Sequence, residues 1–302
     1  MKGTGWMQGA WPGARSRGCG RTAGLWISKR AEVRRVSERL DQALVRRGLI
    51  DTREKAQALI MAGRVYIFEN KAQKPSQKVE EGDELSIRGE LDPYVSRGGH
   101  KLARAVEAFS IDARGVTALD IGASTGGFTD VLLRAGARKV YAIDVGYGQL
   151  AYKLRADERV VVMERTNARY LTPEMFAEQP ELGVTDVSFI SLRLILPAAL
   201  AIVRDRFVAL IKPQFEAGRE RVGKKGVVRD PAVHAEVVRD IVGFVPTLGW
   251  HVRALDYSPI TGPEGNIEFL CDIVPGAEGS VDMDTIPALV ARAHAALDKR
   301  AQ

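Results

Sequence analysis

A glycine-rich turn lies between two aspartates, and each aspartate closes a short run of β-forming residues. Asp120 ends the first run and Asp144 ends the second. The glycines between them are Gly122, Gly126 and Gly127, and helical periodicity begins at the last of these. Glycine allows a tight turn and lets a ligand approach the backbone without meeting a Cβ atom. A strand, such a turn and a helix open a doubly wound α/β domain, whose ligands lie beyond the carboxyl ends of the strands.

The spacing of these glycines limits the kind of ligand. Their order is G-x-x-x-G-G, and the G-x-G-x-x-G pattern that holds a pyrophosphate is absent. A ribose-binding acid is expected about 20 residues after such a turn, where Asp144 stands. A nucleoside cofactor without a pyrophosphate satisfies both observations, and S-adenosylmethionine is the common one. The alternative is an ordinary turn in which glycine serves only geometry. The expected cofactor-binding residues are Gly122, Ser124, Gly126, Gly127, Asp144 and Asn167.

Four ionisable residues stand where a doubly wound sheet carries its chemistry. Lys101 opens a helix, Asp186 lies in the fourth expected strand, Lys212 ends the fifth, and Glu268 lies in a late strand. Each one alone is more often a structural ion pair or a surface charge. Lys212 is the least ordinary of them, because it ends an apolar strand and precedes a proline.

These residues need a sheet to position them, and the sequence alternates strand and helix patterns through most of its length. Further strands are expected at residues 139–144, 159–163, 185–191, 206–212, 250–257 and 266–274. Helices are expected at residues 192–203, 231–248 and 285–299. Five βα units followed by a closing strand pair fit an α/β fold with the sheet of a class I methyltransferase.

A smaller basic region precedes this sheet. Apolar residues at helical spacing predict helices over residues 36–45 and 53–61, the second capped by Thr52. Short strands are expected at residues 65–67 and 85–87. From Arg34 to Arg64 there are eight basic residues against four acidic ones, and charges alone favour a merely solvated surface.

A pattern within this region changes that interpretation. Residues 39–41, Leu44, Gly48-Leu49, Thr52-Arg53 and residues 63–65 together resemble the S4 RNA-binding module. The resemblance weakens after Val65, where Phe68-Glu69-Asn70 replaces the usual short Asn-Gly turn. It implies a small α+β domain whose basic side chains follow an RNA backbone without reading bases. The RNA-binding residues implied are Arg39, Arg46, Arg47, Arg53, Lys55 and Arg64.

Two longer motifs extend the resemblance. The run Ser96-Arg97-Gly98-Gly99-His100-Lys101-Leu102, together with residues 120–130, resembles the TlyA family, S4-bearing relatives of the FtsJ/RrmJ-type ribose methyltransferases. That family implies methylation of cytidine 2′-hydroxyls in 16S and 23S ribosomal RNA, with ribosomal subunits as partners. It also implies a catalytic tetrad made of Lys101, Asp186, Lys212 and Glu268. A neutral lysine amine then accepts the hydroxyl proton, and no metal is required.

The pattern divides the chain into four expected segments. Residues 1–32 form a disordered or misassigned N-terminal extension, 33–90 the S4 domain, 91–99 a linker, and 100–302 the methyltransferase domain.

Composition excludes several other classes of protein. The net charge of +6 and a pI near 9.3 favour a polyanionic partner. Cys19 and Cys271 form no disulfide framework, which suits a reducing cytoplasm, and the four histidines have no metal-ligand spacing. The apolar run at residues 194–203 is shorter than the roughly 18 residues of a membrane span.

Three alternatives remain open at this point. A nucleotide-dependent oxidoreductase is disfavoured by the missing G-x-G-x-x-G pattern, and a hemolysin-like membrane protein by the missing span. An RNA-binding protein with an inactive methyltransferase fold is disfavoured by the intact tetrad. The oligomeric state is open as well.

Overall fold

The structure is a computed structural model that describes residues 37–89, 92–223, 225–276 and 281–297. The chain divides into two compact units, residues 1–90 and 91–302, and each is described by itself. The expected extension over residues 1–32 lies outside the described residues.

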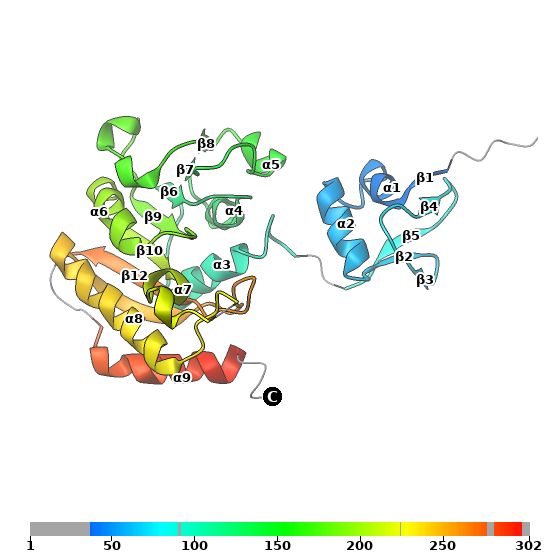
Figure 1. Ribbon diagram of the computed structural model, residues 1–302. Coiled ribbons are helices and arrows are strands. Elements are labelled where there is room, and N and C mark those ends of the chain that lie inside the picture. Colours follow the sequence, from blue (N-terminus) through cyan, green and yellow to red (C-terminus); the bar gives the residue numbers. More distant parts are fainter. Residues whose placement is uncertain (1–36, 90–91, 224, 277–280, 298–302) are drawn as a thin grey trace, which may run out of the picture. The chain divides into compact units, whose positions relative to one another are not determined.

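The first unit packs two helices against short strands. Its core is formed by apolar residues of both helices and of the strands, including Leu40, Leu44, Ile60 and Val65. The helices are α1 (Leu40–Arg46) and α2 (Arg53–Met61). A three-stranded antiparallel sheet has the order β3-β2-β5, with β2 Val65–Ile67, β3 Asn70–Lys71 and β5 Leu85–Ile87. A second pair joins β1 (Glu38–Arg39) to β4 (Lys78–Val79) (Figure 1).

Local chemistry explains the start of each helix. The Thr52 side chain accepts a hydrogen bond from the backbone N–H of Lys55, as an N-cap does, so α2 begins where the sequence predicts. The first helix begins at Leu40, later than predicted, because residues 38 and 39 pair with β4 instead.

The larger unit is built on a seven-stranded sheet of order β11-β12-β10-β9-β6-β7-β8. Strands β6 to β10 are parallel, whereas β12 runs antiparallel to both β10 and β11. Their bounds are β6 Thr117–Ile121, β7 Lys139–Ile143, β8 Val160–Met163, β9 Leu182–Thr185, β10 Arg206–Ile211, β11 Trp250–Tyr257 and β12 Phe269–Pro275. The strand order reverses between β6 and β9, and ligands of such sheets bind outside the carboxyl ends of the strands at that point.

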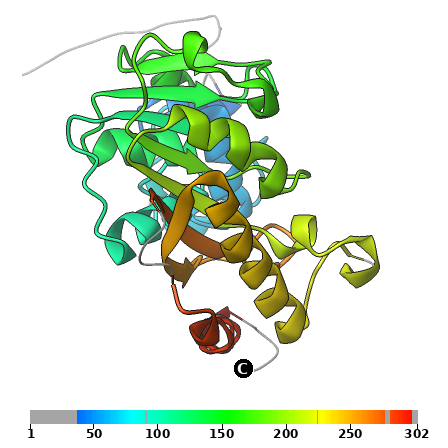
Figure 2. The same ribbon diagram turned by 90° about the vertical axis from the view of Figure 1, so that its left-hand side faces the viewer.

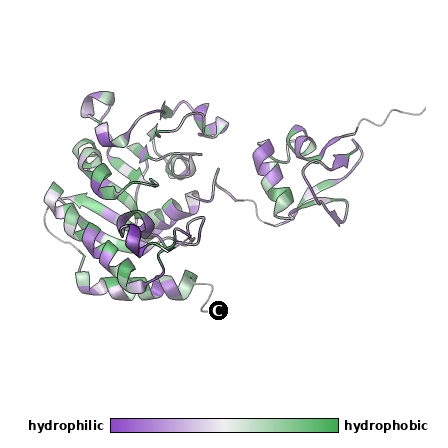
Figure 3. Cartoon of the chain, in the orientation of Figure 1, coloured by the Kyte–Doolittle hydropathy of each residue, from purple (hydrophilic) through white to green (hydrophobic). Residues whose placement is uncertain are grey.

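Helices cover both faces of the sheet (Figures 1 and 2). One face carries α3 (Gly99–Ala108), α4 (Gly127–Arg134) and α5 (Tyr152–Arg155), and the other carries α6 (Leu192–Ile202), α8 (Pro231–Phe244) and α9 (Ile286–Leu297). Side chains of β6 alternate between the faces, since Leu119 packs with α6 and Ala118 with α4. The strands therefore contribute apolar side chains to the cores on both faces. Much of the sheet is accordingly green in Figure 3.

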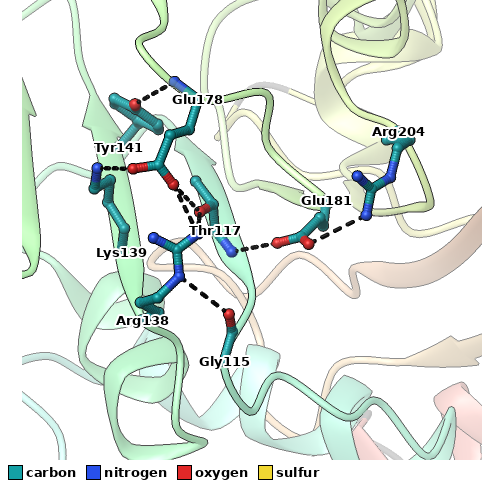
Figure 4. Close-up of polar contacts among 8 residues, drawn as sticks. All are labelled: Gly115, Thr117, Arg138, Lys139, Tyr141, Glu178, Glu181 and Arg204. Atoms are coloured by element: carbon teal, nitrogen blue, oxygen red, sulfur yellow. Dashed lines mark hydrogen bonds and ion pairs between the residues drawn. The ribbon is translucent and has the colours of Figure 1, made fainter.

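The amino ends of the strands are fastened by ion pairs that lie far along the sheet from its carboxyl edge. Glu178 accepts hydrogen bonds from Arg138, Lys139 and Thr117, and Arg138 lowers the pKa of Glu178 to about 2 (Figure 4). Glu181 accepts the backbone N–H of Thr117 at 2.6 Å. These charges act on structure, because they hold the loop before β9 against β6 and β7.

Three strand predictions need correction. The fourth strand, predicted over residues 185–191, occupies Leu182–Thr185, because its ladder with β6 ends where Gly122 begins the turn. Asp186 therefore follows the strand. Glu268 precedes β12, and Lys212 follows β10 and precedes the short helix α7 (Pro213–Glu216). The expected linker is also one residue shorter, since Gly99 belongs to α3. Within the described residues, no helix is long and apolar enough to span a membrane.

Candidate active site

The four predicted tetrad residues meet at the carboxyl edge of the sheet. Lys101 comes from α3, Asp186 directly follows β9, Lys212 directly follows β10 and Glu268 directly precedes β12. Asp186 lies between the two lysines: its Oδ1 is 2.6 Å from Nζ of Lys212, and its Oδ2 is 3.3 Å from Nζ of Lys101. Glu268 Oε2 lies 2.7 Å from Nζ of Lys101. The four groups form one continuous chain of charges.

These charged groups are unusual because they are buried. Lys101, Lys212 and Glu268 are 6%, 7% and 1% exposed, and buried charges persist only when they are paired. Burial by itself lowers the pKa of Lys101, but the charges of Asp186 and Glu268 outweigh it and raise that pKa above its usual value. Lys101 is therefore a fixed cation.

The two lysines have different neighbours. Lys101 is held between two carboxylates, whereas Lys212 has one carboxylate and one hydroxyl, because its Nζ donates to Oγ of Ser188 at 2.9 Å. Our sequence reasoning missed Ser188. The available indication was its place two residues after Asp186, in the segment that follows β9.

The loop that carries Asp186 and Ser188 is fixed at both ends. The backbone N–H of Asp186 bonds to the carbonyl of Ile121 at 3.2 Å. At the other end, Glu216 accepts the Ser191 hydroxyl at 2.6 Å and the Leu192 N–H at 2.7 Å, and burial raises the pKa of Glu216. Its carboxylate thereby satisfies the first turn of α6.

A cavity of about 360 Å³ lies beside the tetrad and includes Asp186 and Ser188 in its lining. Of the predicted cofactor residues, Gly122, Ser124, Asp144 and Asn167 line it. The Asp144 carboxylate is held in place, since Oδ2 accepts the Ser124 N–H at 2.8 Å and Oδ1 the Gly146 N–H at 2.7 Å. Further lining residues that the sequence did not indicate are Val145, Gln149, Thr166 and Ile195.

Gly126 and Gly127 do not line this cavity. Gly126 has a φ of 95° before α4, and a Cβ atom there would collide with Leu154. A Cβ atom on Gly127 would collide with Ser96 and lie 2.9 Å from the backbone nitrogen of Gly99. Both glycines permit close packing, and Gly127 lets the start of α3 approach α4 and so positions Lys101.

A cavity of about 430 Å³ lies elsewhere, between residues 227–229 and 261–265. It contains no tetrad residue and none of the glycine-rich turn, so its size does not make it the reaction site.

The basic residues predicted to bind RNA lie in the first unit, and most have partners within it. Arg39 and Arg53 both donate to the buried Asp41, at 2.9 Å each. Arg46 pairs with Glu38, and Arg47 donates to the backbone carbonyls of Asp83 and Glu80. Lys55 lies in the first turn of α2, and Arg64 directly precedes β2. The intramolecular bonds fix the directions of four guanidinium groups.

A doubly wound sheet with this strand order, a cavity for a nucleoside cofactor at its switch point and a lysine–carboxylate chain beside that cavity define a class I methyltransferase that uses S-adenosylmethionine. The FtsJ-like methyltransferase family matches residues 94–272, and the S4 domain family matches residues 38–85. The chain belongs to the TlyA family, the S4-bearing branch of these enzymes.

Individual relatives agree with this assignment. The chain is 50% identical over 234 residues to the 16S/23S rRNA (cytidine-2′-O)-methyltransferase TlyA of Mycobacterium tuberculosis, covering 76% of this chain and 87% of the relative. It is 41% identical to Hemolysin A of Brachyspira hyodysenteriae, covering 78% and 99%. A solved structure from Streptococcus thermophilus is 45% identical with a TM-score of 0.70, covering 88% and 98%. Membership of this family rules out the oxidoreductase alternative.

Proposed function

We propose that this protein transfers the methyl group of S-adenosylmethionine to the ribose 2′-hydroxyl of a cytidine in ribosomal RNA, in the 16S and 23S molecules of the subunits. The observation that carries the proposal is the pair of buried lysines joined by Asp186 at the edge of the cofactor cavity. A base, a fixed cation and a carboxylate between them suit a reaction that must remove a proton from a weakly acidic hydroxyl.

The cavity fits the cofactor on two observations. The Asp144 carboxylate is held by backbone N–H groups in the position of a ribose-binding acid, and Gly122, with a φ of 85°, lines the cavity where a Cβ atom would lie 3.2 Å from the carbonyl oxygen of Asp186. When bound, S-adenosylmethionine supplies an electrophilic methyl group on a sulfonium centre. The residues of this chain then have to hold the hydroxyl in line and take its proton.

Lys212 is the base in this mechanism. It accepts the 2′-hydroxyl proton on Nζ as the oxygen–carbon bond forms and the carbon–sulfur bond breaks. Lys101 stays protonated, since two carboxylates raise its pKa, and Asp186 lies between it and Lys212. Asp186 orients both amines, and Glu268 holds Lys101. Most of the acceleration comes from placing the reacting groups.

Arginines at the edge of the site support an RNA substrate. Within the described residues, Arg165, Arg169 and Arg219 make no ion pair with an acid, although most other arginines of this unit do. Arg169 and Arg219 line a groove that also contains Phe189 and Phe215. Arginines that have no carboxylate partner are available to phosphates.

The experiment is methylation of isolated ribosomal subunits. After incubation with the protein and S-adenosylmethionine, nucleoside mass spectrometry should find 2′-O-methylcytidine, and mapping should locate it. An oligonucleotide with 2′-deoxycytidine at the mapped site should accept no methyl group. Methylation of a base, or of the deoxy oligonucleotide, would exclude ribose as the acceptor.

A further inference from the structure

Among the polar contacts that the two buried lysines make within the described part of the chain, Ser188 is the one neutral side-chain partner. Lys212 Nζ lies 2.6 Å from Asp186 Oδ1 and donates to Ser188 Oγ at 2.9 Å. Ser188 is exposed and lines the cofactor cavity, while Lys212 is 7% exposed. The serine hydroxyl thus joins the proposed base to the lining of the cofactor cavity.

The contact with Ser188 restricts the direction of the lone pair of Lys212, because an amine can make only a limited number of hydrogen bonds. A neutral lysine amine has two N–H groups and one lone pair, and only the lone pair can take a proton. Ser188 accepts one N–H at 2.9 Å, and the Asp186 carboxylate lies 2.6 Å from Nζ as its ion-pair partner. With both partners in place, the lone pair of the neutral amine has fewer directions open to it. With Asp186 alone, rotation about the Cε–Nζ bond would spread the lone pair over several directions.

The loop is built to keep Ser188 in place. Residues 186–191 are tied to Ile121 at one end and to Glu216 at the other. Between these ties, Phe189 has a φ of 64°, a left-handed conformation that bulky residues rarely adopt. Such strain persists only where the surroundings hold it, and it is concentrated at functional positions.

We propose that Ser188 is a positioning residue of the methyl transfer: by accepting one N–H of Lys212, it directs the lone pair of Lys212 at the ribose 2′-hydroxyl. The inference rests on the proposed function. In the transfer, the oxygen–carbon bond forms, the carbon–sulfur bond breaks, and the hydroxyl proton moves to Nζ of Lys212. Ser188 keeps its own proton throughout.

Single-turnover and steady-state kinetics of the full chain on ribosomal subunits test this role. Ser188→Ala should lower the single-turnover rate and kcat about tenfold to a hundredfold, which is the scale of loss from misplaced reacting groups. KM for the subunits and the affinity for S-adenosylmethionine should stay within about twofold, because the hydroxyl acts on the base alone. Ser188→Thr retains a hydroxyl and should recover most of the rate. Ser110→Ala, at an exposed serine between α3 and β6, should match the wild type.

Each other outcome overturns the inference. A single-turnover rate within twofold of wild type in Ser188→Ala would show that the hydroxyl does not direct the base. Equal losses in the alanine and threonine variants would assign the effect to packing, and a loss confined to cofactor affinity would assign Ser188 to binding. If the wild type itself makes no 2′-O-methylcytidine, the proposed function fails first, and that result is recognised before any variant is compared.

Discussion

Lys212 and Lys101 have the same side chain and lie at the same edge of the sheet, but their neighbours assign them different tasks. Two carboxylates raise the pKa of Lys101, so it is suited to remain a cation. Lys212 has one carboxylate and the Ser188 hydroxyl as neighbours, so one fewer negative charge lies beside it. The base is therefore expected at Lys212, and Lys101 supplies a fixed positive charge beside it.

Lys212→Arg tests that division. Arginine keeps the positive charge but does not deprotonate at working pH. If Lys212 removes the 2′ proton, the single-turnover methylation rate should fall by a factor of a thousand or more while both substrates still bind, a loss confined to the transition state. Rapid-quench methylation and calorimetry of cofactor binding measure the two quantities separately.

Lys101→Arg is the matched control for this prediction, because it changes the other lysine while keeping its charge. It should be milder, since a guanidinium can still pair with Asp186 and Glu268. Near-normal single-turnover methylation by the Lys212→Arg protein would end the assignment of Lys212 as base and leave it a residue that only orients the substrate.

Asp120 is another buried ionisable residue near the glycine-rich turn, and its pKa is shifted by burial. Its carboxyl is fully buried at the end of β6 and accepts the Thr129 hydroxyl at 2.7 Å. Burial raises its pKa to about 7, from a usual value near 3.8. The folded protein therefore keeps this proton over a range of pH in which the unfolded chain loses it.

Asp120→Asn should remove that dependence on pH. The protonated carboxyl contributes stability that is complete below about pH 4 and is lost as the pH rises to about 7. Relative to the asparagine variant, the wild type should lose on the order of 4 kcal/mol of unfolding free energy over this interval. Urea denaturation at several pH values measures it. Asp205→Asn, at an exposed site, controls for the altered net charge. Parallel stability curves for wild type and Asp120→Asn would refute the raised pKa.

At the scale of elements, the site depends on a short link between α7 and α6. Glu216 comes four residues after Lys212 and accepts hydrogen bonds from the Ser191 hydroxyl and from the Leu192 N–H, the first of α6. One carboxylate thus ties the loop of Asp186 and Ser188 to the segment that carries the base. If the contacts of Glu216 are lost, the loop and the first turn of α6 should both become less ordered.

Glu216→Ala removes this link and leaves the Leu192 N–H without its partner. The expected cost is about 1–2 kcal/mol of unfolding free energy, the usual range for a lost helix cap. Hydrogen exchange of the amides in residues 187–192 should accelerate, and kcat should fall. Glu216→Gln keeps an acceptor oxygen and should lose less on every measure. Unchanged exchange in the alanine variant would mean that the loop is held by its other contacts.

The sequence predicts elements well where local chemistry marks their ends. The cap at Thr52 and the apolar spacing after it place α2 at residues 53–61, and Asp230 with Pro231 places the start of α8. The fourth strand was predicted at the wrong position, because residues 185–191 have the residue pattern of a strand. The real extent of this strand is set by its pairing with β6. Pairing of distant segments is not visible in a local pattern.

The same limit applies to the site. The tetrad came from family resemblance to particular positions, and the contacts among those positions follow from the sheet topology. The sequence did not indicate Ser188, because a single serine forms no distinctive sequence pattern. Its role depends on which lysine the fold brings next to it. Likewise, no residue pattern shows that Arg39 and Arg53 converge on Asp41.

At the scale of the whole molecule, the residues predicted to bind RNA and the residues of the cofactor site lie in different units. The first unit matches the S4 domain and contains the basic residues predicted to hold RNA, and the second contains the cofactor cavity and the tetrad. Every residue that lines the cofactor cavity belongs to the second unit. Cofactor binding should therefore not need the first unit.

Deletion of residues 1–90 tests that separation. The shortened protein should bind S-adenosylmethionine within about threefold of the full chain, because the cavity is intact. Its affinity for ribosomal RNA should fall by orders of magnitude, and the remaining affinity should depend less steeply on salt, since each lost phosphate contact reduces the slope of log K against log salt by roughly 0.7–0.9. Calorimetry gives the first quantity, and filter binding between 50 and 200 mM salt gives the second.

The double variant Arg46→Ala with Arg47→Ala in the full chain is a milder change. It should reduce the salt slope by the amount expected for about two lost phosphate contacts. A slope unchanged by the deletion would mean that the basic residues of the first unit are only solvated, and that the arginines around the methyltransferase site hold the RNA by themselves.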